Sequence, residues 1–358
     1  MAPTSHQRRQ DAPDQQDRSC VYEPPARALL ASIMHISDVI NGVRTRLAGA
    51  AGFAPTIVAY PGYGSTTWVR VLARVVLTTR KPAATDKVRG WRAFTSVPVR
   101  NGEVEVEIGG VIHPVHADSG GLVDVVLETS LAPGWHPVSL RSPHTAPAEA
   151  RVLVVAPDTR FGIVTDIDDT VMVTALPRPL LALWNTLVLS ERARTPTPGM
   201  AVLLDRIASR HPEAPVLYLS TGPWNVAPAL ARFLARNLYP EGVLLLTDWG
   251  PTRQRWFRSG WEHKHNNLQR LAREFPGVRW LLVGDDGQHD PAIYADFARA
   301  HAGQTAAIAI RQLSAGEALL AGGRAHEDAP ATEHGAVPWV SAPDGAGLAA
   351  QLKDAGIL

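Results

Sequence analysis

Residues 161–170 have the sequence FGIVTDIDDT, in which an apolar run ends in a cluster of carboxylates. A run without polar alternation is typical of a strand that is buried on both faces of a parallel sheet. The closely spaced Asp166 and Asp168 repel each other, since two like charges ~4 Å apart cost about 4 kcal/mol at an effective dielectric of ~20. We therefore expect a cation beside them, although such a pair can also serve only as a cap for a following helix.

Further apolar runs follow this stretch and are separated by helical patterns. They are APVLYLS (214–220), GVLLLT (242–247), RWLLVGD (279–285) and TAAIAI (305–310). Buried strands that alternate with helices predict an α/β fold, a doubly wound parallel sheet over residues 157–358. In such a sheet ligands bind outside the carboxyl ends of the strands. Polar residues that end these strands are therefore the candidates for chemistry.

A second acidic cluster lies at the end of one of these runs. It is GDDGQHD (284–290), and it supplies Asp285, Asp286 and Asp290. If its strand is a neighbour of the first, up to six carboxylates converge, which suits a hard divalent cation. The alternative is an Asp-Gly turn that leads into a helix. That alternative explains Gly287 but not why both clusters end strands of one sheet.

Two weaker signals lie between the acidic clusters. One strand ends in Ser220 and Thr221, and Lys264 lies near the start of a helical pattern. A hydroxyl and an ammonium are suitable donors to phosphate oxygens. Taken singly, the hydroxyl is equally well a helix cap and the lysine a solvated surface residue.

The order of these four signals resembles the four motifs of the haloacid dehalogenase superfamily, over roughly residues 160–315. Within it, the segments DIDDT, STGPWN and GDDGQHDPAIY are similar to the catalytic domain of the actin-patch type phosphatidate phosphatases, a lipin-related family. The upstream YPGYGS (60–65) is similar to the N-terminal part of the same group. The chain departs from the family in having Gly222 and Asp286 where a serine is usual.

The resemblance implies a magnesium-dependent phosphatase that hydrolyses a phosphate monoester, with phosphatidate as the expected substrate and diacylglycerol as the lipid product. Asp166 would be the nucleophile that is transiently phosphorylated, and Asp168 the general acid and then base. Ser220 and Lys264 would hold phosphoryl oxygens. The remaining substrate-binding residues would be Thr170, Thr221 and Gly222, and the Mg²⁺ ligands would be Asp166, the backbone carbonyl of Asp168, Asp285 and Asp290.

Two other functions stay open at this point. The motifs establish the chemistry and leave the leaving group undefined, so the substrate can instead be a soluble phosphorylated metabolite. The chain can also be a non-catalytic scaffold or interaction protein. The scaffold is disfavoured because inactive relatives usually lose a nucleophile or a metal ligand, and this chain keeps them.

The part of the chain before residue 157 has three compositions. Residues 1–23 are polar and predict a disordered tail, and residues 24–54 have apolar residues at helical spacing. That helix packs on its own protein or lies on a membrane surface. Residues 55–156 contain short strand patterns such as GEVEVEIGG (102–110), which predict a smaller, sandwich-like β-rich domain. Within the α/β part, residues 171–199 predict a short helical insertion, packed on the domain or forming a lid that contacts lipid.

The amino-acid composition excludes further classes of function and location. The 35 Lys and Arg residues balance 34 Asp and Glu residues, so no global field attracts nucleic acid. The one cysteine excludes an internal disulfide framework. No apolar run of a secretory signal follows the first basic residues. We expect a cytoplasmic protein with possible peripheral membrane contact, acting on a phosphorylated lipid or small molecule.

Overall fold

The computed structural model describes residues 53–79, 97–143, 145–173, 195–247, 253–287, 289–321 and 337–358. The chain divides into two compact units, Met1–Leu47 and Ala48–Leu358, and all described residues belong to the second. The expected tail 1–23, nearly all of the expected helix 24–54 and most of the insertion 171–199 lie outside the described residues.

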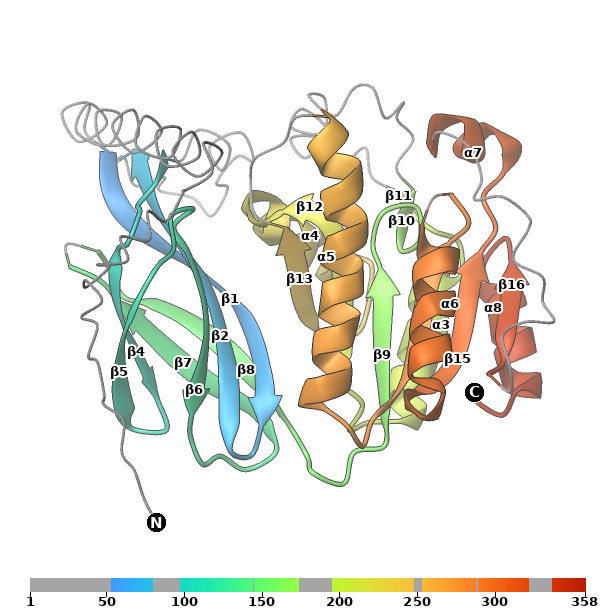
Figure 1. Cartoon of the computed structure of the whole chain (residues 1–358), viewed down its shortest axis with the longest axis horizontal. Coiled ribbons are helices and arrows are strands. Elements are labelled where there is room, and N and C mark those ends of the chain that lie inside the picture. Colours follow the sequence, from blue (N-terminus) through green and yellow to red (C-terminus); the bar gives the residue numbers. More distant parts are fainter. Residues whose placement is uncertain are drawn as a thin grey trace, which may run out of the picture. The chain divides into compact units, whose positions relative to one another are not determined.

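Six strands form one parallel sheet; the apolar runs predict five of them, and the sixth is β16 (Figure 1). Their order is β13 (Val243–Thr247), β12 (Val216–Pro223), β9 (Phe161–Asp166), β14 (Arg279–Asp285), β15 (Thr305–Arg311) and β16 (Trp339–Ala342). Every pairing among them is parallel. Most of their side chains are buried, because helices cover both faces. The strand β9, which carries FGIVTD, therefore lies between β12 and β14.

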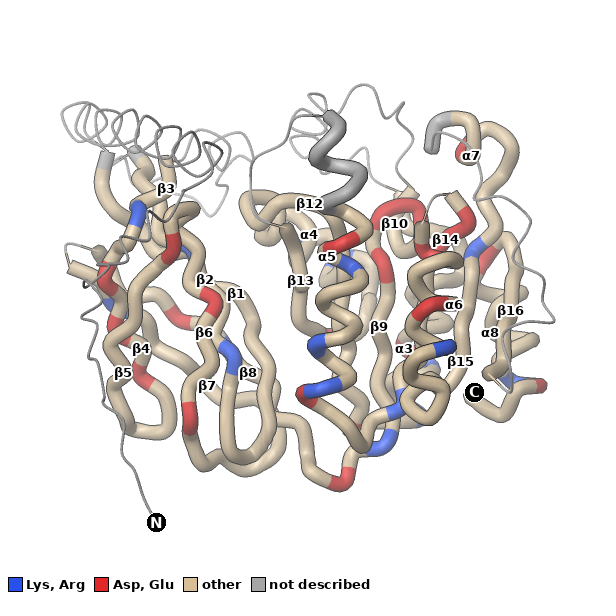
Figure 2. Tube along the Cα trace, viewed as in Figure 1, with Lys and Arg blue, Asp and Glu red and all other residues tan. Residues whose placement is uncertain are grey.

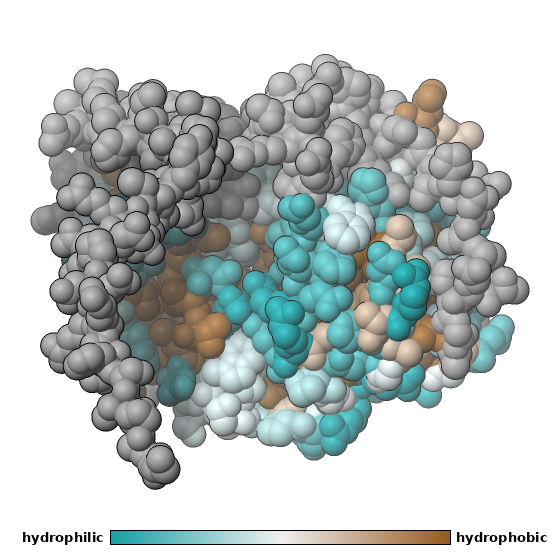
Figure 3. Space-filling view, viewed as in Figure 1, coloured by the Kyte–Doolittle hydropathy of each residue, from teal (hydrophilic) through white to brown (hydrophobic). Residues whose placement is uncertain are grey.

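Helices cover both faces of the sheet. The helices of this part of the chain are α3 (Met200–Arg210), α4 (Ala227–Arg236), α5 (Arg253–Glu274), α6 (Asp290–Ala300), α7 (Ala315–Ala321) and α8 (Gly345–Asp354), with short 3₁₀ helices η4 (Trp224–Val226) and η5 (Ala302–Gln304). Of these, α7 packs on Leu313, apart from the core of the sheet. α5 contacts α6, and α3 contacts α8. Figure 1 shows α5 and α6 in front of the sheet, and the outward surface over α5 is largely hydrophilic in Figure 3. A proline opens both α4 and α6, where its missing N–H costs nothing.

The preceding residues form a second sheet of eight strands. They are β1 (Phe53–Ser65), β2 (Trp68–Thr79), β3 (Val97–Pro98), β4 (Glu103–Ile108), β5 (Val111–His116), β6 (Leu122–Glu128), β7 (Gly134–Arg141) and β8 (Ala148–Val155). The order is β3-β2-β1-β8-β7-β4-β5, with β6 also paired to β2. Val71 of β2 and Val106 of β4 lie near opposite ends of this order but share one core, so the sheet curls over it. In β4, as the alternation predicts, valine and isoleucine are buried and most of the glutamates exposed.

The two sheets pack against each other through a common buried cluster. Tyr60, Tyr63 and Val155 of the curled sheet belong to the same buried cluster as the strands of the parallel sheet. The Tyr63 hydroxyl donates to Glu274 Oε2 at 2.7 Å, and Arg70 Nη2 donates to Glu274 Oε1 at 2.8 Å. The contacts within Ala48–Leu358 form one compact unit and do not divide it near residue 157. The division into domains 55–156 and 157–358 therefore stays a prediction.

One expected boundary is wrong. The predicted helix 24–54 overlaps β1, which begins at Phe53, and Pro55 disfavours helical backbone at the residue before it. The flanks of the predicted insertion, about residues 171–199, pair as a small antiparallel ribbon, β10 (Met172–Val173) with β11 (Thr195–Pro196), and the helical part stays a prediction. Within the described ranges, no helix combines the length and apolar character that crossing a bilayer requires.

A glycine sets the spacing between the two strands that carry the acidic clusters. A Cβ on Gly162 of β9 would overlap the Cζ3 and Cε3 atoms of Trp280 on β14, a fully buried ring. We expect Gly162→Ala to lower the free energy of unfolding by about 1–3 kcal/mol, measured by urea denaturation. Gly303→Ala, where the new methyl group meets open space, is the matched control and should change stability by less than ~0.5 kcal/mol. Equal stability of the two variants would contradict the packing described.

Candidate active site

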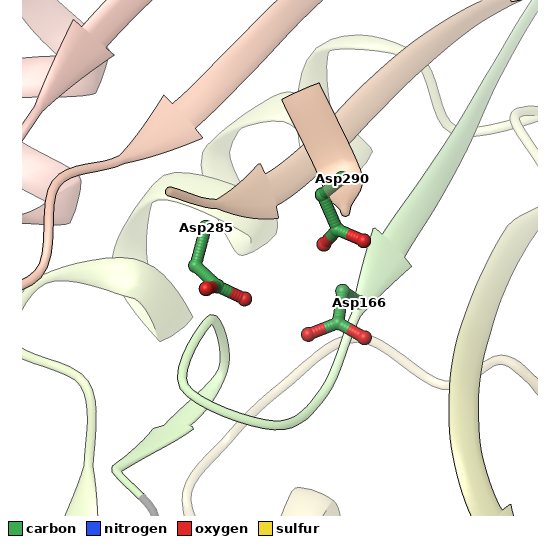
Figure 4. A group of neighbouring side chains, drawn as sticks. All are labelled: Asp166, Asp285 and Asp290. Carbon is green, nitrogen blue, oxygen red and sulfur yellow. The ribbon is translucent and has the colours of Figure 1, made fainter. Parts of the chain in front are cut away.

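Three buried carboxylates converge at the carboxyl edge of the parallel sheet. Asp166 ends β9, Asp285 ends the neighbouring β14, and Asp290 begins α6. One oxygen from each lies within 4.8 Å of the others, and the residues are 2 %, 6 % and 3 % exposed. Figure 4 shows their carboxylates turned toward a common space, and Figure 2 shows acidic residues gathered near β10 and β14. The neighbouring parallel strands therefore bring together the two acidic clusters of the sequence.

Lys264 of α5 supplies a positive charge to this group. Its Nζ lies 2.6 Å from Asp166 Oδ1 and 2.5 Å from Asp290 Oδ1. The lysine is 9 % exposed, so its stem crosses packed protein before the ammonium reaches the carboxylates. One ammonium against three carboxylates leaves a net charge of −2 when all are ionised, a large charge for a buried site.

Two carboxylate oxygens show where further positive charge fits. Asp166 Oδ2 and Asp290 Oδ2 are buried and have no hydrogen-bond partner among the described residues. Buried, unpaired charged oxygens are costly, and hard divalent cations bind through such oxygens. Asp166, Asp285 and Asp290 therefore fit a divalent cation by donor type and position.

The pKa values agree with a shortage of positive charge. Burial raises the pKa of Asp166 well above its ordinary value; Lys264 opposes this shift, while Asp290 and Asp285 add to it. Burial, then Asp290, raises the pKa of Asp285 to about 7. Burial lowers the pKa of Lys264, but Asp166 and Asp290 outweigh burial and the net shift is upward. The protein alone thus holds the lysine charged more effectively than it holds the carboxylates ionised.

Asp168 and Ser220 are hydrogen-bonded to each other at the carboxyl edge of the parallel sheet. Asp168 is half-buried, and its Oδ2 accepts a 2.8 Å hydrogen bond from Ser220 Oγ, which in turn accepts from the Gly222 amide at 2.9 Å. The pairing of β12 with β13 is irregular between Leu219 and Pro223, so the segment that carries Ser220 bulges out of the sheet. Bulges of this kind re-aim side chains beside active sites.

Thr170 and Thr221 have different surroundings. Thr170 Oγ1 donates to Asp285 Oδ2 at 3.4 Å, so it orients a carboxylate of the cluster. The Thr221 backbone carbonyl accepts from Thr247 Oγ1 at 2.9 Å, and a Cβ on Gly260 of α5 would lie 3.2 Å from the Thr221 methyl group. Of the adjacent residues Ser220 and Thr221, Ser220 is the one whose hydroxyl is hydrogen-bonded to Asp168.

The expected convergence of six carboxylates is wrong for part of the set. Asp286 Oδ1 accepts the Leu313 amide at 2.8 Å, so this side chain holds the chain that follows β15. Asp169 and Asp168 also lie outside the group of three that share a 4.8 Å sphere. Successive residues at a strand end point in different directions, which is why adjacent aspartates do not all reach one centre.

Arg311 is a site residue that sequence reasoning missed. It is 4 % exposed, its Nη1 donates to the Asp169 carbonyl at 2.6 Å and its Nη2 pairs with Glu317 at 2.7 Å. Asp169 has a φ of 59°, a conformation that a non-glycine residue adopts only when its surroundings impose it. Arg311 therefore helps to hold the turn that follows Asp166. The available signal was an arginine directly after the apolar run TAAIAI, at the same sheet edge as the acidic clusters.

Comparisons with known proteins point to one family. Residues 161–312 match the model described as "Phosphatidate phosphatase APP1, catalytic domain". This match confirms the predicted resemblance. Phosphatidate phosphatase APP1 of Saccharomyces cerevisiae is 24 % identical over 200 residues, 54 % of this chain and 34 % of the relative. An uncharacterized protein of Schizosaccharomyces pombe is 24 % identical over 154 residues, 43 % of this chain and 25 % of the relative. The chain thus spans about a third of the first relative and a quarter of the second.

Two solved structures are similar over part of the chain. A class C acid phosphatase from Bacillus anthracis with tungstate bound gives a TM-score of 0.27 at 19 % identity, over 41 % of this chain and 65 % of that one. The HAD domain of the effector Lem4 from Legionella pneumophila gives 0.30 at 16 % identity, over 44 % and 87 %. TM-scores of this size do not establish a shared fold.

Adjacent aspartates provide a matched pair for testing the cation site. We expect Asp285→Asn to weaken Mg²⁺ binding at least about tenfold, the loss typical even of residues that only support metal ligands. Asp286→Asn should leave Mg²⁺ affinity unchanged, because its carboxylate is directed to the Leu313 amide. Calorimetric titration of both variants measures the difference, and equal losses would place the cation elsewhere.

Proposed function

We propose that the α/β part of the chain, residues 157–358, is a magnesium-dependent phosphatase that hydrolyses a phosphate monoester through a phosphorylated Asp166. The observation that carries this proposal is the buried group of Asp166, Asp285 and Asp290, with Lys264 Nζ 2.6 Å from Asp166. A nucleophilic carboxylate can attack a phosphate dianion only where positive charge offsets both. The match of residues 161–312 to a phosphatase catalytic domain supports the same chemistry.

Asp166, Asp285 and Asp290 would hold the Mg²⁺ ion, with the backbone carbonyl of Asp168 as the remaining protein ligand. When bound, the ion neutralises the carboxylates and stabilises charge on the transferring phosphoryl group. The net charge of −2 on Lys264 and its three carboxylates, and the partnerless Asp166 Oδ2, support this assignment.

The reaction has two steps. In the first, an Asp166 carboxylate oxygen forms a bond to phosphorus while the bond to the ester oxygen breaks, and Asp168 gives its proton to the departing alcohol. In the second, Asp168 takes a proton from water, whose oxygen attacks phosphorus and releases orthophosphate from Asp166. The half-buried position of Asp168 at the rim supports its exchange of protons with a leaving group and with water.

The remaining residues would bind the phosphoryl oxygens. Ser220 is favoured over Thr221, since its hydroxyl is already hydrogen-bonded to Asp168. Lys264 would contact the transferring group while offsetting the charge of Asp166. Thr221 and Gly222 would line the phosphate-binding site. Thr170 would contribute by orienting the Asp285 carboxylate.

Phosphatidate is the proposed substrate, with diacylglycerol as the alcohol released. The name of the S. cerevisiae relative supports this, although the chain covers only 34 % of that protein. A cytoplasmic location with peripheral contact to a lipid surface belongs to the same proposal. The scaffold alternative is disfavoured, because Asp166, Lys264 and Asp285 are present and assembled.

A release assay tests substrate and cofactor together. We expect orthophosphate release from phosphatidate in mixed phosphatidate and phosphatidylcholine vesicles with Mg²⁺, and loss of release with chelator. Soluble esters such as glycerol 3-phosphate should be cleaved at least about tenfold more slowly. Equal or faster release from soluble esters would instead identify a metabolite phosphatase, and no release from any ester would favour the scaffold.

Asp166→Asn tests the covalent step. We expect the variant to lose at least about 10⁴-fold in kcat, as is typical when a nucleophile is removed. Its thermal midpoint should stay within a few degrees of the parent, because the substitution removes one charge from a cluster of excess negative charge. Phosphate release is the measurement, and a variant of normal activity would exclude Asp166 as the nucleophile.

A further inference from the structure

A tyrosine of the curled sheet touches the segment that carries Ser220. Tyr60 of β1 is 4 % exposed, and its ring stacks on Trp224 with centroids 4.7 Å apart at 29°. Its hydroxyl donates to the Trp224 backbone carbonyl at 3.2 Å. Trp224 is itself 3 % exposed and follows Ser220 by four residues. The contact therefore joins a residue remote in sequence to the end of the proposed phosphate-binding segment.

Tyr60 reaches this position because β1 is irregular. The pairing of β1 with β2 shifts between Tyr60 and Tyr63. In a regular strand, side chains three residues apart point to opposite faces, yet both tyrosines are buried in the core of the parallel sheet. A Cβ on Gly62 would collide with the Arg70 carbonyl, so the bulge requires glycine there. The segment YPGYGS thus serves to turn two tyrosines toward the parallel sheet.

The segment from Ser220 to Trp224 depends on side chains for its shape. Its regular pairing with β13 is interrupted between Leu219 and Pro223. Thr247 Oγ1 donates to the carbonyls of Thr221 and Gly222 at 2.9 and 3.2 Å, which holds the middle of the segment from β13. Tyr60 holds its far end from the other sheet.

We infer that Tyr60 is a positioning residue for phosphate binding: by fixing Trp224 it sets the bulge that places the Ser220 hydroxyl, whose oxygen accepts from the Gly222 amide at 2.9 Å. This inference rests on the proposed phosphatase function. It gives the curled sheet a part in the reaction, because Tyr60, which belongs to β1, would set the position of the Ser220 hydroxyl. Tyr60 itself touches no reacting atom and acts through Trp224.

The test compares variants of the full chain. Tyr60→Leu removes the ring and the hydroxyl, and Tyr60→Phe keeps the stack but loses the hydrogen bond. Tyr63→Phe is the matched control, because it removes an equally buried hydroxyl of the same strand whose partner, Glu274, ends α5. If Tyr60→Leu does not fold, Tyr60→Met keeps the apolar volume with a flexible side chain. Orthophosphate affinity and Mg²⁺ affinity by calorimetry, the kcat and KM of phosphate release, and Tm are measured for each.

We expect Tyr60→Leu to weaken orthophosphate binding and raise KM about tenfold while Mg²⁺ affinity stays within twofold. Tyr60→Phe should lose less, and Tyr63→Phe should bind orthophosphate as the parent does. A fall in Tm alone would show that Tyr60 is only a core residue, and equal losses of Mg²⁺ and orthophosphate affinity would show general disruption of the site; either result overturns the inference. A parent protein that cleaves no ester, but whose orthophosphate affinity falls in Tyr60→Leu as expected, would overturn the proposed function and leave the positioning role in place. A parent that binds no orthophosphate overturns both.

Discussion

The excess of negative charge at the carboxyl edge of the parallel sheet is the constraint on which the site depends. Three buried carboxylates share a 4.8 Å sphere with one ammonium to offset them. Folding keeps them there because their backbone positions are set by buried strands and a helix start, whose packing outweighs the electrostatic cost. The upward pKa shifts of Asp166 and Asp285 report that cost. A site with this excess of negative charge is suited to binding a cation.

Two irregular strands convert this charged edge into a site with directional contacts. The bulge in β12 lifts Ser220 to Asp168, and the bulge in β1 aims Tyr60 at the end of that same segment. Regular ladders would bury both side chains in other directions. The left-handed backbone of Asp169, with its carbonyl bonded to Arg311, adds a third local departure from regular geometry. These departures gather around one edge, as is usual for functional sites.

The core of the site was predictable from sequence for a simple reason. Carboxyl ends of parallel strands meet at one edge, so two apolar runs that end in aspartates place Asp166 and Asp285 together once the sheet is inferred. Asp286 could not be assigned in this way, because the direction of its side chain depends on the path of the chain after β15. Arg311 and Tyr60 were missed since their roles arise from packing between segments far apart in sequence. The predicted range 24–54 ran past the start of β1 at Phe53, although Pro55 indicated extended backbone there.

The shared packing of the two sheets affects how the protein can be divided. Tyr60, Tyr63, Leu72 and Val155 of the curled sheet belong to a buried cluster that also contains Trp224 and Phe275 of the α/β part of the chain. A recombinant fragment that starts at residue 157 would lack both tyrosines and expose the Trp224 and Phe275 rings to water, an apolar surface of the kind that promotes aggregation. It would also lose the hydrogen bonds that Tyr63 and Arg70 donate to Glu274. Truncation boundaries are therefore better placed before Phe53 than between the sheets.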